Sequence, residues 1–178
     1  MPPDPAALSD LSLSNDGSLV AYVRGVARKH NDNWMLKPQI WLMNSDGSNQ
    51  RMLHDGGAAL GIQGRDVIGS NDPEISPDNR SVVFSHTNTE QHNFPSMIDE
   101  GHDLWTMNID GTGLRRLTQP GPISIIPDWG NDKILYTEYS DADKYCGLVL
   151  INTDGTGKRR LEEGIGLWRG GRHGKFIP

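Results

Sequence analysis

One sequence pattern occurs three times in this chain, and it constrains the fold more than any other feature. The three copies are IWLMNSDGSNQRML (Ile40 to Leu53), LWTMNIDGTGLRRL (Leu104 to Leu117) and LVLINTDGTGKRRL (Leu148 to Leu161). They share Asn-x-Asp-Gly, then Ser or Thr, then a basic residue two positions before a closing leucine. The repeat predicts a chain built from similar units that pack against one another.

A second shared segment precedes each copy. It occurs as LSLSNDGSLVAYV (Leu11 to Val23), PEISPDNRSVVFS (Pro73 to Ser85) and, more loosely, IIPDWGNDKILYTEY (Ile125 to Tyr139). Its turn is rich in Asn, Asp, Pro and Gly, which tight turns require, and the later Asp-Gly pairs are strong hairpin signals. Each unit therefore predicts four strands, the last of them carrying basic residues that protect an exposed sheet edge.

The third predicted strand of each unit is apolar at consecutive positions, as expected of a strand buried on both faces. These strands are Ile40 to Met43, Leu104 to Met107 and Leu148 to Ile151. Four-stranded antiparallel units in series are typical of an all-β fold, the β-propeller. We expect an N-terminal extension at 1–10, blade 1 at 11–53, an inter-blade loop at 54–72, blade 2 at 73–118, blade 3 at 119–161, and the start of a fourth blade or a tail at 162–178.

Three blades do not close a ring, because propellers close with about four to eight. The last segment, GLWRGGRHGKFIP (Gly166 to Pro178), would supply at most a first turn. An open arc leaves two blade faces uncovered, and such apolar patches are uncommon on soluble monomers. We therefore expect a partial ring, completed by further blades in cis or by a homo-oligomer.

The units resemble a known family. The pattern Ser-Pro-Asp-x-x-x-x-x-Phe at Ser76 to Phe84, followed by Leu-Trp-x-Met-Asn-x-Asp-Gly-x-x-x-Arg-Arg-Leu-Thr at Leu104 to Thr118, resembles the WD-repeat-like blade of the TolB propeller family. The resemblance covers roughly residues 11 to 161, with Asn15 where the pattern has Pro. It implies a periplasmic or secreted setting and an adaptor role in envelope complexes.

Composition excludes several classes of function. There are 17 basic and 23 acidic residues, and the net charge of -6 disfavours nucleic acid as a partner. No apolar run approaches the length of a transmembrane segment. The single cysteine, Cys146, rules out an intrachain disulfide framework. The start MPPDPAALSD has no signal-peptide pattern, so we expect any export signal to have been removed or never present.

Strand direction predicts where a partner would bind. The long connections, Arg24 to Gln39, His54 to Asp72 and His86 to Asp103, should share one face, opposite the short Asp-Gly turns. Long loops on a rigid scaffold usually carry binding sites. The partner-binding residues predicted there are Trp34, Met35, His92, Phe94, Met97 and His102.

The richest of these loops suggests a metal site. Imidazole ligands suit zinc, manganese or iron, and the TolB-like fold resembles the propeller of oligogalacturonate lyases, which use a His-rich metal site. The candidate ligands are His86, His92 and His102, whose spacing matches no established ligand motif. The alternative, solvated histidines with no cofactor, is the interpretation we prefer.

Other chemistry finds little support in the sequence. The Asn-x-Asp-Gly turns are not calcium loops, because leucine stands where a bidentate glutamate would be. No Gly-x-Ser-x-Gly elbow occurs, and the acidic neighbours of Cys146 argue against a reactive thiol. We therefore favour a non-enzymatic module that binds a protein or peptide through the long-loop face. The alternatives are a metal-dependent carbohydrate-active propeller, a propeller segment of a larger hydrolase, and a purely structural segment.

Overall fold

The computed structural model describes residues 7–30, 33–56, 69–88, 101–140, 142–143 and 145–163, and all regular structure in this part of the chain is β-strand. The strands are β1 (Ala7–Leu13), β2 (Leu19–His30), β3 (Asn33–Asn44), β4 (Arg51–His54), β5 (Ser70–Ile75), β6 (Ser81–Asn88), β7 (Gly101–Asn108), β8 (Arg115–Arg116), β9 (Ile123–Trp129), β10 (Lys133–Ser140), β11 (Tyr145–Asn152) and β12 (Arg159–Glu163). None of the described residues belongs to a helix long and apolar enough to cross a membrane.

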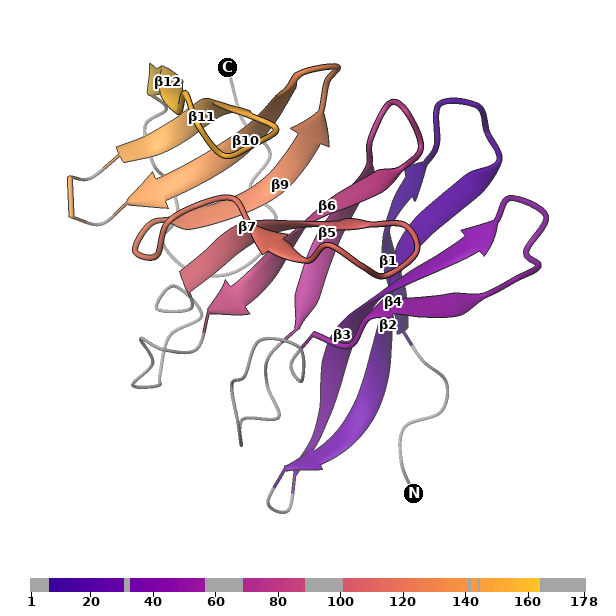
Figure 1. The fold of residues 1–178 in the computed structure, drawn as a ribbon. Coiled ribbons are helices and arrows are strands. Elements are labelled where there is room, and N and C mark those ends of the chain that lie inside the picture. Colours follow the sequence, from indigo (N-terminus) through magenta and orange to yellow (C-terminus); the bar gives the residue numbers. More distant parts are fainter. Residues whose placement is uncertain are drawn as a thin grey trace, which may run out of the picture.

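Three four-stranded antiparallel sheets contain all these strands. Their orders are β1-β2-β3-β4, β5-β6-β7-β8 and β9-β10-β11-β12, so each sheet is a simple up-and-down meander. Figure 1 shows the sheets following one another as successive blades. The predicted all-β, blade-based architecture is confirmed, and we call the sheets blades 1, 2 and 3.

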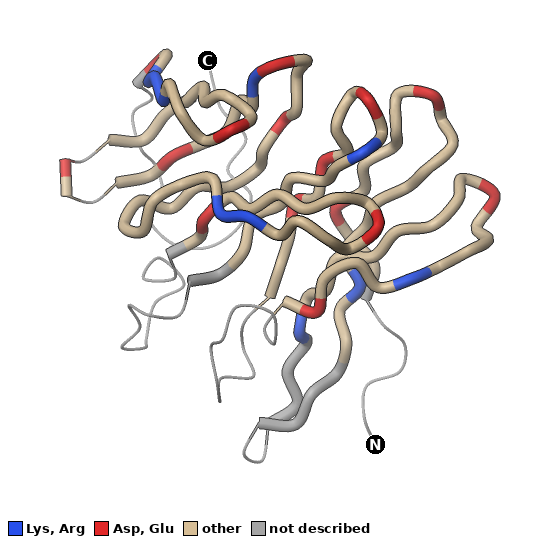
Figure 2. Tube along the Cα trace, in the orientation of Figure 1, with Lys and Arg blue, Asp and Glu red and all other residues tan. Residues whose placement is uncertain are grey.

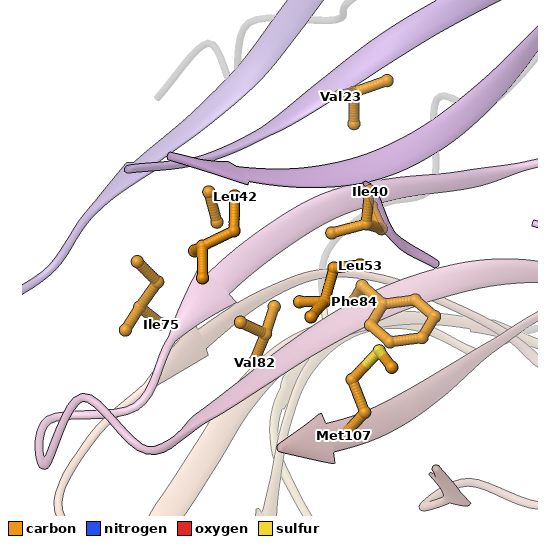
Figure 3. Packing of buried hydrophobic residues seen from close by; sticks show 9 residues of the cluster. Val23, Ile40, Leu42, Leu53, Ile75, Val82, Phe84 and Met107 are labelled. Atoms are coloured by element: carbon orange, nitrogen blue, oxygen red, sulfur yellow. The ribbon is translucent and has the colours of Figure 1, made fainter. Parts of the chain in front are cut away.

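The blades are held together by apolar side chains on facing sheets. Blades 1 and 2 share one cluster, part of which Figure 3 shows, and the Phe84 ring packs in it with no solvent exposure. Its buried members are Ala21, Val23, Ile40, Leu42, Leu53, Ile75, Val82, Phe84 and Met107. Burial of an aromatic or aliphatic side chain contributes about 1.5–3 kcal/mol, so this cluster is a major source of stability.

A second cluster joins blades 2 and 3. Its buried members are Val83, Leu104, Leu117, Ile134, Tyr136, Tyr145, Val149 and Ile151. Val82 and Phe84 contribute to the first cluster while Val83 contributes to the second, because successive strand residues point to opposite faces. Blade 2 is therefore covered on both sides.

The repeated Asn-x-Asp-Gly motif forms the same hairpin turn in each blade. In blade 2, Asp110 Oδ1 accepts hydrogen bonds from the backbone N–H and hydroxyl of Thr112, and Asn108 Nδ2 donates to the same hydroxyl oxygen. Asp46 and Asp154 repeat this arrangement with Ser48 and Thr156. Every polar member of the motif is used within the turn, as predicted for hairpins.

One predicted loop is in fact a long hairpin. The connection from Arg24 to Gln39 was expected to be irregular, but β2 and β3 pair without interruption from Leu19↔Asn44 to His30↔Asn33. The prediction was wrong because it ended the second strand at Val23 and began the third at Ile40, where the apolar runs end and begin. Two paired strands satisfy one another's backbone groups whatever their side chains, so charged residues are tolerated there.

Candidate functional site at the long-connection face

The β2–β3 hairpin extends past the rest of blade 1. The last pair between β1 and β2 is Ala7↔Gly25, and the last between β3 and β4 is Ile40↔His54. Beyond these, residues 26–30 and 33–37 pair only with one another among the described strands, and we call this two-stranded extension the finger. Figure 1 shows it projecting on the side where β4 ends and β7 begins, which we call the long-connection face.

Two of the predicted partner-binding residues lie on this finger. Trp34 pairs with Lys29, and Met35 pairs with Arg28. The described part of the finger also contains Lys37 and has no acidic residue. It is therefore a basic segment with aromatic and apolar residues, on a chain whose net charge is -6.

The base of the finger is fixed to the β4 and β5 ends. A side chain at Gly69 would overlap the Pro38 ring, and one at Gly56, where φ is +75°, would lie 2.7 Å from the Pro38 carbonyl oxygen. Lys37 Nζ donates to Asp55 Oδ2 at 2.9 Å, and Gln39 Nε2 donates to Asp55 Oδ1 at 2.5 Å. These contacts orient the finger relative to the boundary of blades 1 and 2.

Beside this base, two histidines and a serine form a buried network between blades 1 and 2. Ser70 Oγ lies 3.1 Å from His54 Nδ1 and 2.9 Å from His86 Nδ1. Since the Gly56 backbone N–H donates to His54 Nδ1 at 3.1 Å, that nitrogen is an acceptor and the His54 proton lies on Nε2. The three side chains are at most 3% exposed.

Burial keeps both imidazoles neutral. It lowers the pKa of His54 from 6.5 to about 4, an effect partly offset by the Asp55 carboxylate. It lowers the pKa of His86 to about 3, with a further contribution from the positive charge that His54 would carry. The Nε2 atoms of both rings are buried and have no hydrogen-bond partner among the described residues. Neutral rings are the form that such a site can accommodate.

An ion pair lies at the same end of blade 2. Arg116 Nη2 on β8 donates to Asp103 Oδ2 on β7, and Asp103 is buried. The Arg116 guanidinium also lies 5.8 Å from the centre of the Trp105 ring, within the range of a cation–π interaction. These groups give the long-connection end of blade 2 a fixed polar lining.

The predicted site residues have different outcomes. His86 is a buried core histidine, and His102 is half-buried on β7, whereas His92, Phe94 and Met97 lie outside the described residues. Among the residues that are described, no group of three or more His, Cys, Asp or Glu side chains could hold a metal ion. Sequence reasoning overlooked His54 and Ser70. His54 follows the closing leucine of its repeat, as the buried Thr118 does in blade 2, and this match is the signal that could have identified it.

The opposite face of the molecule has a different charge. Aspartates occupy the tips of the short turns, as Figure 2 shows, and hydrogen bonds within the turns, or with Lys133 for Asp132, lower their pKa values. They are Asp16, Asp46, Asp78, Asp110, Asp132 and Asp154. The acidic short-turn face and the basic finger therefore lie at opposite ends of the blades.

The meandering sheets and their face-to-face packing define part of a β-propeller. No protein-family model and no curated protein matches the chain. A putative TolB from Agrobacterium tumefaciens matches 90% of this chain with a TM-score of 0.60 and 19% identity. The acylaminoacyl peptidase of Pyrococcus horikoshii matches 90% with a TM-score of 0.61 and 16% identity, and an oligogalacturonate lyase in complex with manganese matches 89% with 0.58 and 13%.

The fold is that of a TolB-like β-propeller. The chain spans 50% of the length of the Agrobacterium structure, 26% of the peptidase and 42% of the lyase. At these identities the similarity describes the fold, and the neighbours include both TolB proteins and enzymes.

Proposed function

We propose that this chain is a non-enzymatic propeller module that binds an extended segment of a protein or peptide through its long-connection face. The observation that carries the proposal is the finger, which leaves the four-stranded blade at Gly25 and Ile40. Within the blade, β2 and β3 each have a neighbour on both sides. In the finger each strand has one edge with no described partner strand, and an extended peptide can add to such an edge through backbone hydrogen bonds.

The charge of the finger specifies the kind of peptide. Arg28 and Lys29 favour a segment with acidic residues, whereas Lys37 is already paired with Asp55. Trp34 belongs to a residue type that is enriched at interfaces. A fixed base reduces the ordering cost of binding, and the contacts of Pro38 and Asp55 supply it. The TolB-like fold supports a periplasmic or secreted setting for this interaction.

Removal of the finger tests the proposal. In the variant, Asn-Gly replaces residues 27–36. This two-residue turn connects Val26 to Lys37, which are paired across β2 and β3 in the present hairpin. A phage-displayed library of random linear peptides is selected on the wild-type chain, and enriched peptides are measured by fluorescence anisotropy. We expect acidic, extended peptides whose Kd rises at least about tenfold on the trimmed variant.

A charge-reversed variant separates binding from folding. Arg28→Glu with Lys29→Glu keeps the hairpin length and should weaken the same peptides, whereas Arg80→Glu, near the short-turn face, should leave their Kd unchanged. Thermal unfolding of every variant checks that the blades remain intact. Selected peptides that bind the trimmed and wild-type chains equally, or a library that yields no binder, would refute the proposal.

The similarity to the peptidase supports a second candidate, a non-catalytic propeller segment of a larger hydrolase. In that case the long-connection face would contact a catalytic domain. The metal-dependent alternative requires ligands from outside the described residues, because those within them form no group of three. Calorimetric titration with Mn²⁺ tests it: binding that His86→Ala and His102→Ala abolish would favour the enzyme over the adaptor.

A further inference from the structure

The two terminal blades each present an apolar face that no other described blade covers. On blade 1 this face is on the side of the sheet that points away from blade 2. The leucines of its inner strand, β1, are highly exposed: Leu8 66%, Leu11 73% and Leu13 62%. The strand register places Tyr22 beside Leu11, and Trp41 between Tyr22 and Met52, so these residues share the face. Tyr22 is only 4% exposed, whereas Met52 is 48% exposed, so the exposed part of the face is formed by the β1 leucines and Met52. The face extends across all four strands of the blade.

The sequence repeat shows what this face is built to contact. Leu13, Val20, Tyr22, Trp41 and Met43 align with Ile75, Val82, Phe84, Trp105 and Met107 of blade 2. The blade 2 residues form the surface that packs against blade 1. Ile75 is only 4% exposed, whereas its counterpart Leu13 is 62% exposed. Blade 1 thus carries the surface with which a blade receives the preceding blade.

The far side of blade 3 carries the complementary surface. Leu135, Leu148, Leu150 and Leu161 align with Ala21, Ile40, Leu42 and Leu53, the residues of blade 1 that pack against blade 2. The closing leucine shows the difference. Leu53 and Leu117 are 8% and 4% exposed, because the next blade covers them, whereas Leu161 is 43% exposed. Blade 3 therefore carries the surface that a blade offers to the following blade.

A polar contact accompanies each internal junction. Arg51, two positions before its closing leucine, donates from Nη2 to the Ile109 carbonyl oxygen in the Asp-Gly turn of blade 2. Arg115 does the same with the Thr153 and Asp154 carbonyl oxygens of blade 3, at 2.8 and 2.6 Å. The third member of this series is Arg159, which is exposed. The matching acceptors are the carbonyl oxygens of Ser45 and Asp46 in the blade 1 turn.

We propose that blade 3 of one copy packs on blade 1 of a second copy, and that two copies close one ring by making this contact twice. One chain carries both complementary surfaces, so a second copy supplies the partner for each. Each new junction repeats the two internal ones, with Leu161 against the blade 1 face and Arg159 against the Asp46 turn. The three described blades of each copy give six in two copies, within the range of about four to eight in which propellers close. This inference does not depend on the proposed peptide binding.

Light scattering after size-exclusion chromatography tests the proposal on the whole chain. We expect a single species of twice the 19.7 kDa chain mass. Leu13→Asp and Leu161→Asp should each yield monomers, because each variant damages one side of both junctions. Both side chains are exposed within one chain, so neither change should prevent its folding, which circular dichroism checks.

Mixing the two variants distinguishes a ring from unspecific association. One intact blade 3 surface and one intact blade 1 surface remain, so the mixture should recover a heterodimer held by a single junction. Ile126→Asp is the matched control, because Ile126 is also an exposed apolar residue, at 61%. Aspartate suits its backbone φ of +54°, since Asp10 (+48°) and Asp72 (+50°) adopt similar values in the inner strands of the other blades. This control should remain dimeric.

A finer measurement concerns the arginine series. Arg159→Ala removes the expected hydrogen bonds across the junction and should raise the dimer Kd about tenfold, whereas the exposed Arg80→Ala should not. A wild-type mass of one chain, or of three or more, overturns the two-copy ring. So does a mixture of Leu13→Asp and Leu161→Asp that stays monomeric, or a control that dissociates.

Discussion

The two internal junctions share an apolar centre but differ in the polar groups that they bury. Between blades 1 and 2 these are the neutral imidazoles of His54 and His86, bridged by Ser70. In blade 3 a carboxylate takes this role: Glu138 has no solvent exposure and is paired with Lys158 Nζ at 2.5 Å and Arg160 Nη2 at 3.2 Å.

This difference shows two physical solutions to one problem. A buried polar group is costly unless it is neutral or paired, and the first junction uses neutrality while blade 3 uses pairing. The apolar positions recur because each blade must fit the next. The polar residues of the Asp-Gly turns recur as well, whereas the buried polar residue beside the apolar centre differs, being His86 in blade 2 and Glu138 in blade 3.

Lowering the pH should give the largest difference in stability between the junction with neutral histidines and the blade with the paired carboxylate. His54 and His86 have an unfolded pKa of 6.5 and folded pKa values of about 4 and about 3. Above pH 6.5 neither state is protonated. Below it the unfolded chain binds protons that the folded chain does not, so stability falls by about 1.4 kcal/mol per pH unit for each histidine. Urea unfolding followed by tryptophan fluorescence between pH 7.5 and 4.5 measures this slope.

The control is His54→Phe with His86→Phe, which keeps two rings but removes the titration. Its stability should depend much less on pH over the same range, with the remainder due to carboxyls such as Asp72 and Glu74, whose pKa values burial raises. The turn carboxylates act in a different window, since the contribution of Asp16, whose pKa is lowered from 3.8 to about 2, is lost only as pH falls through those values. A flat wild-type profile above pH 4.5 would show that the imidazoles are not buried as described.

Loss of a fully buried ring should affect the first junction next most strongly. Phe84→Ala removes a fully buried ring from the cluster between blades 1 and 2, and we expect about 3–5 kcal/mol lower stability. Tyr136, at the matching position of blade 3, donates from its hydroxyl to Glu138 Oε2 at 3.2 Å. Tyr136→Phe keeps the ring and should cost only about 1 kcal/mol. Equal losses in chemical denaturation would mean that packing does not dominate.

Removal of the cations should test the pairing solution. Lys158→Ala with Arg160→Ala leaves the Glu138 carboxylate buried without these partners, and we expect a loss of about 3 kcal/mol at pH 7. Adding Glu138→Gln to this variant should restore much of the stability, because the buried group is then uncharged. Denaturant titrations of both variants measure the difference, and no recovery would argue against an unpaired charge as the cause.

The smallest effect should come from the turns. Gly155 and Gly111 have φ of +88° and +90°, so alanine is strained at both by about 1 kcal/mol. A Cβ at Gly155 would also lie 3.0 Å from the Leu117 carbonyl oxygen of blade 2. A Cβ at Gly111 would have no such atom within 4 Å. Gly155→Ala should therefore lower Tm about 2–4 °C more than Gly111→Ala. Equal shifts in calorimetry would exclude a close turn-to-blade contact.

Repeats made the blades predictable from sequence alone. The Asn-x-Asp-Gly motif marked all three hairpins correctly, since its hydrogen bonds form within a few residues. The finger was not predicted, because Arg28 and Lys29 are poor strand signals and only pairing with Met35 and Trp34 makes them strand residues. The candidate site was only partly predicted: His86 was singled out as a metal ligand or a solvated histidine, whereas it is 1% exposed within a network that was not predicted.

The sequence by itself determined the three repeated units, their Asp-Gly turns and the buried third strands, because these depend on local pattern and on repetition. Only the tertiary structure decided which polar residues meet. His54 and Ser70 belong to different blades and are 16 positions apart, and Arg51 reaches a carbonyl 58 positions away. Such contacts depend on how one sheet stacks on the next, which no local pattern records. The same stacking left Leu13 and Leu161 exposed, although their repeat partners are buried.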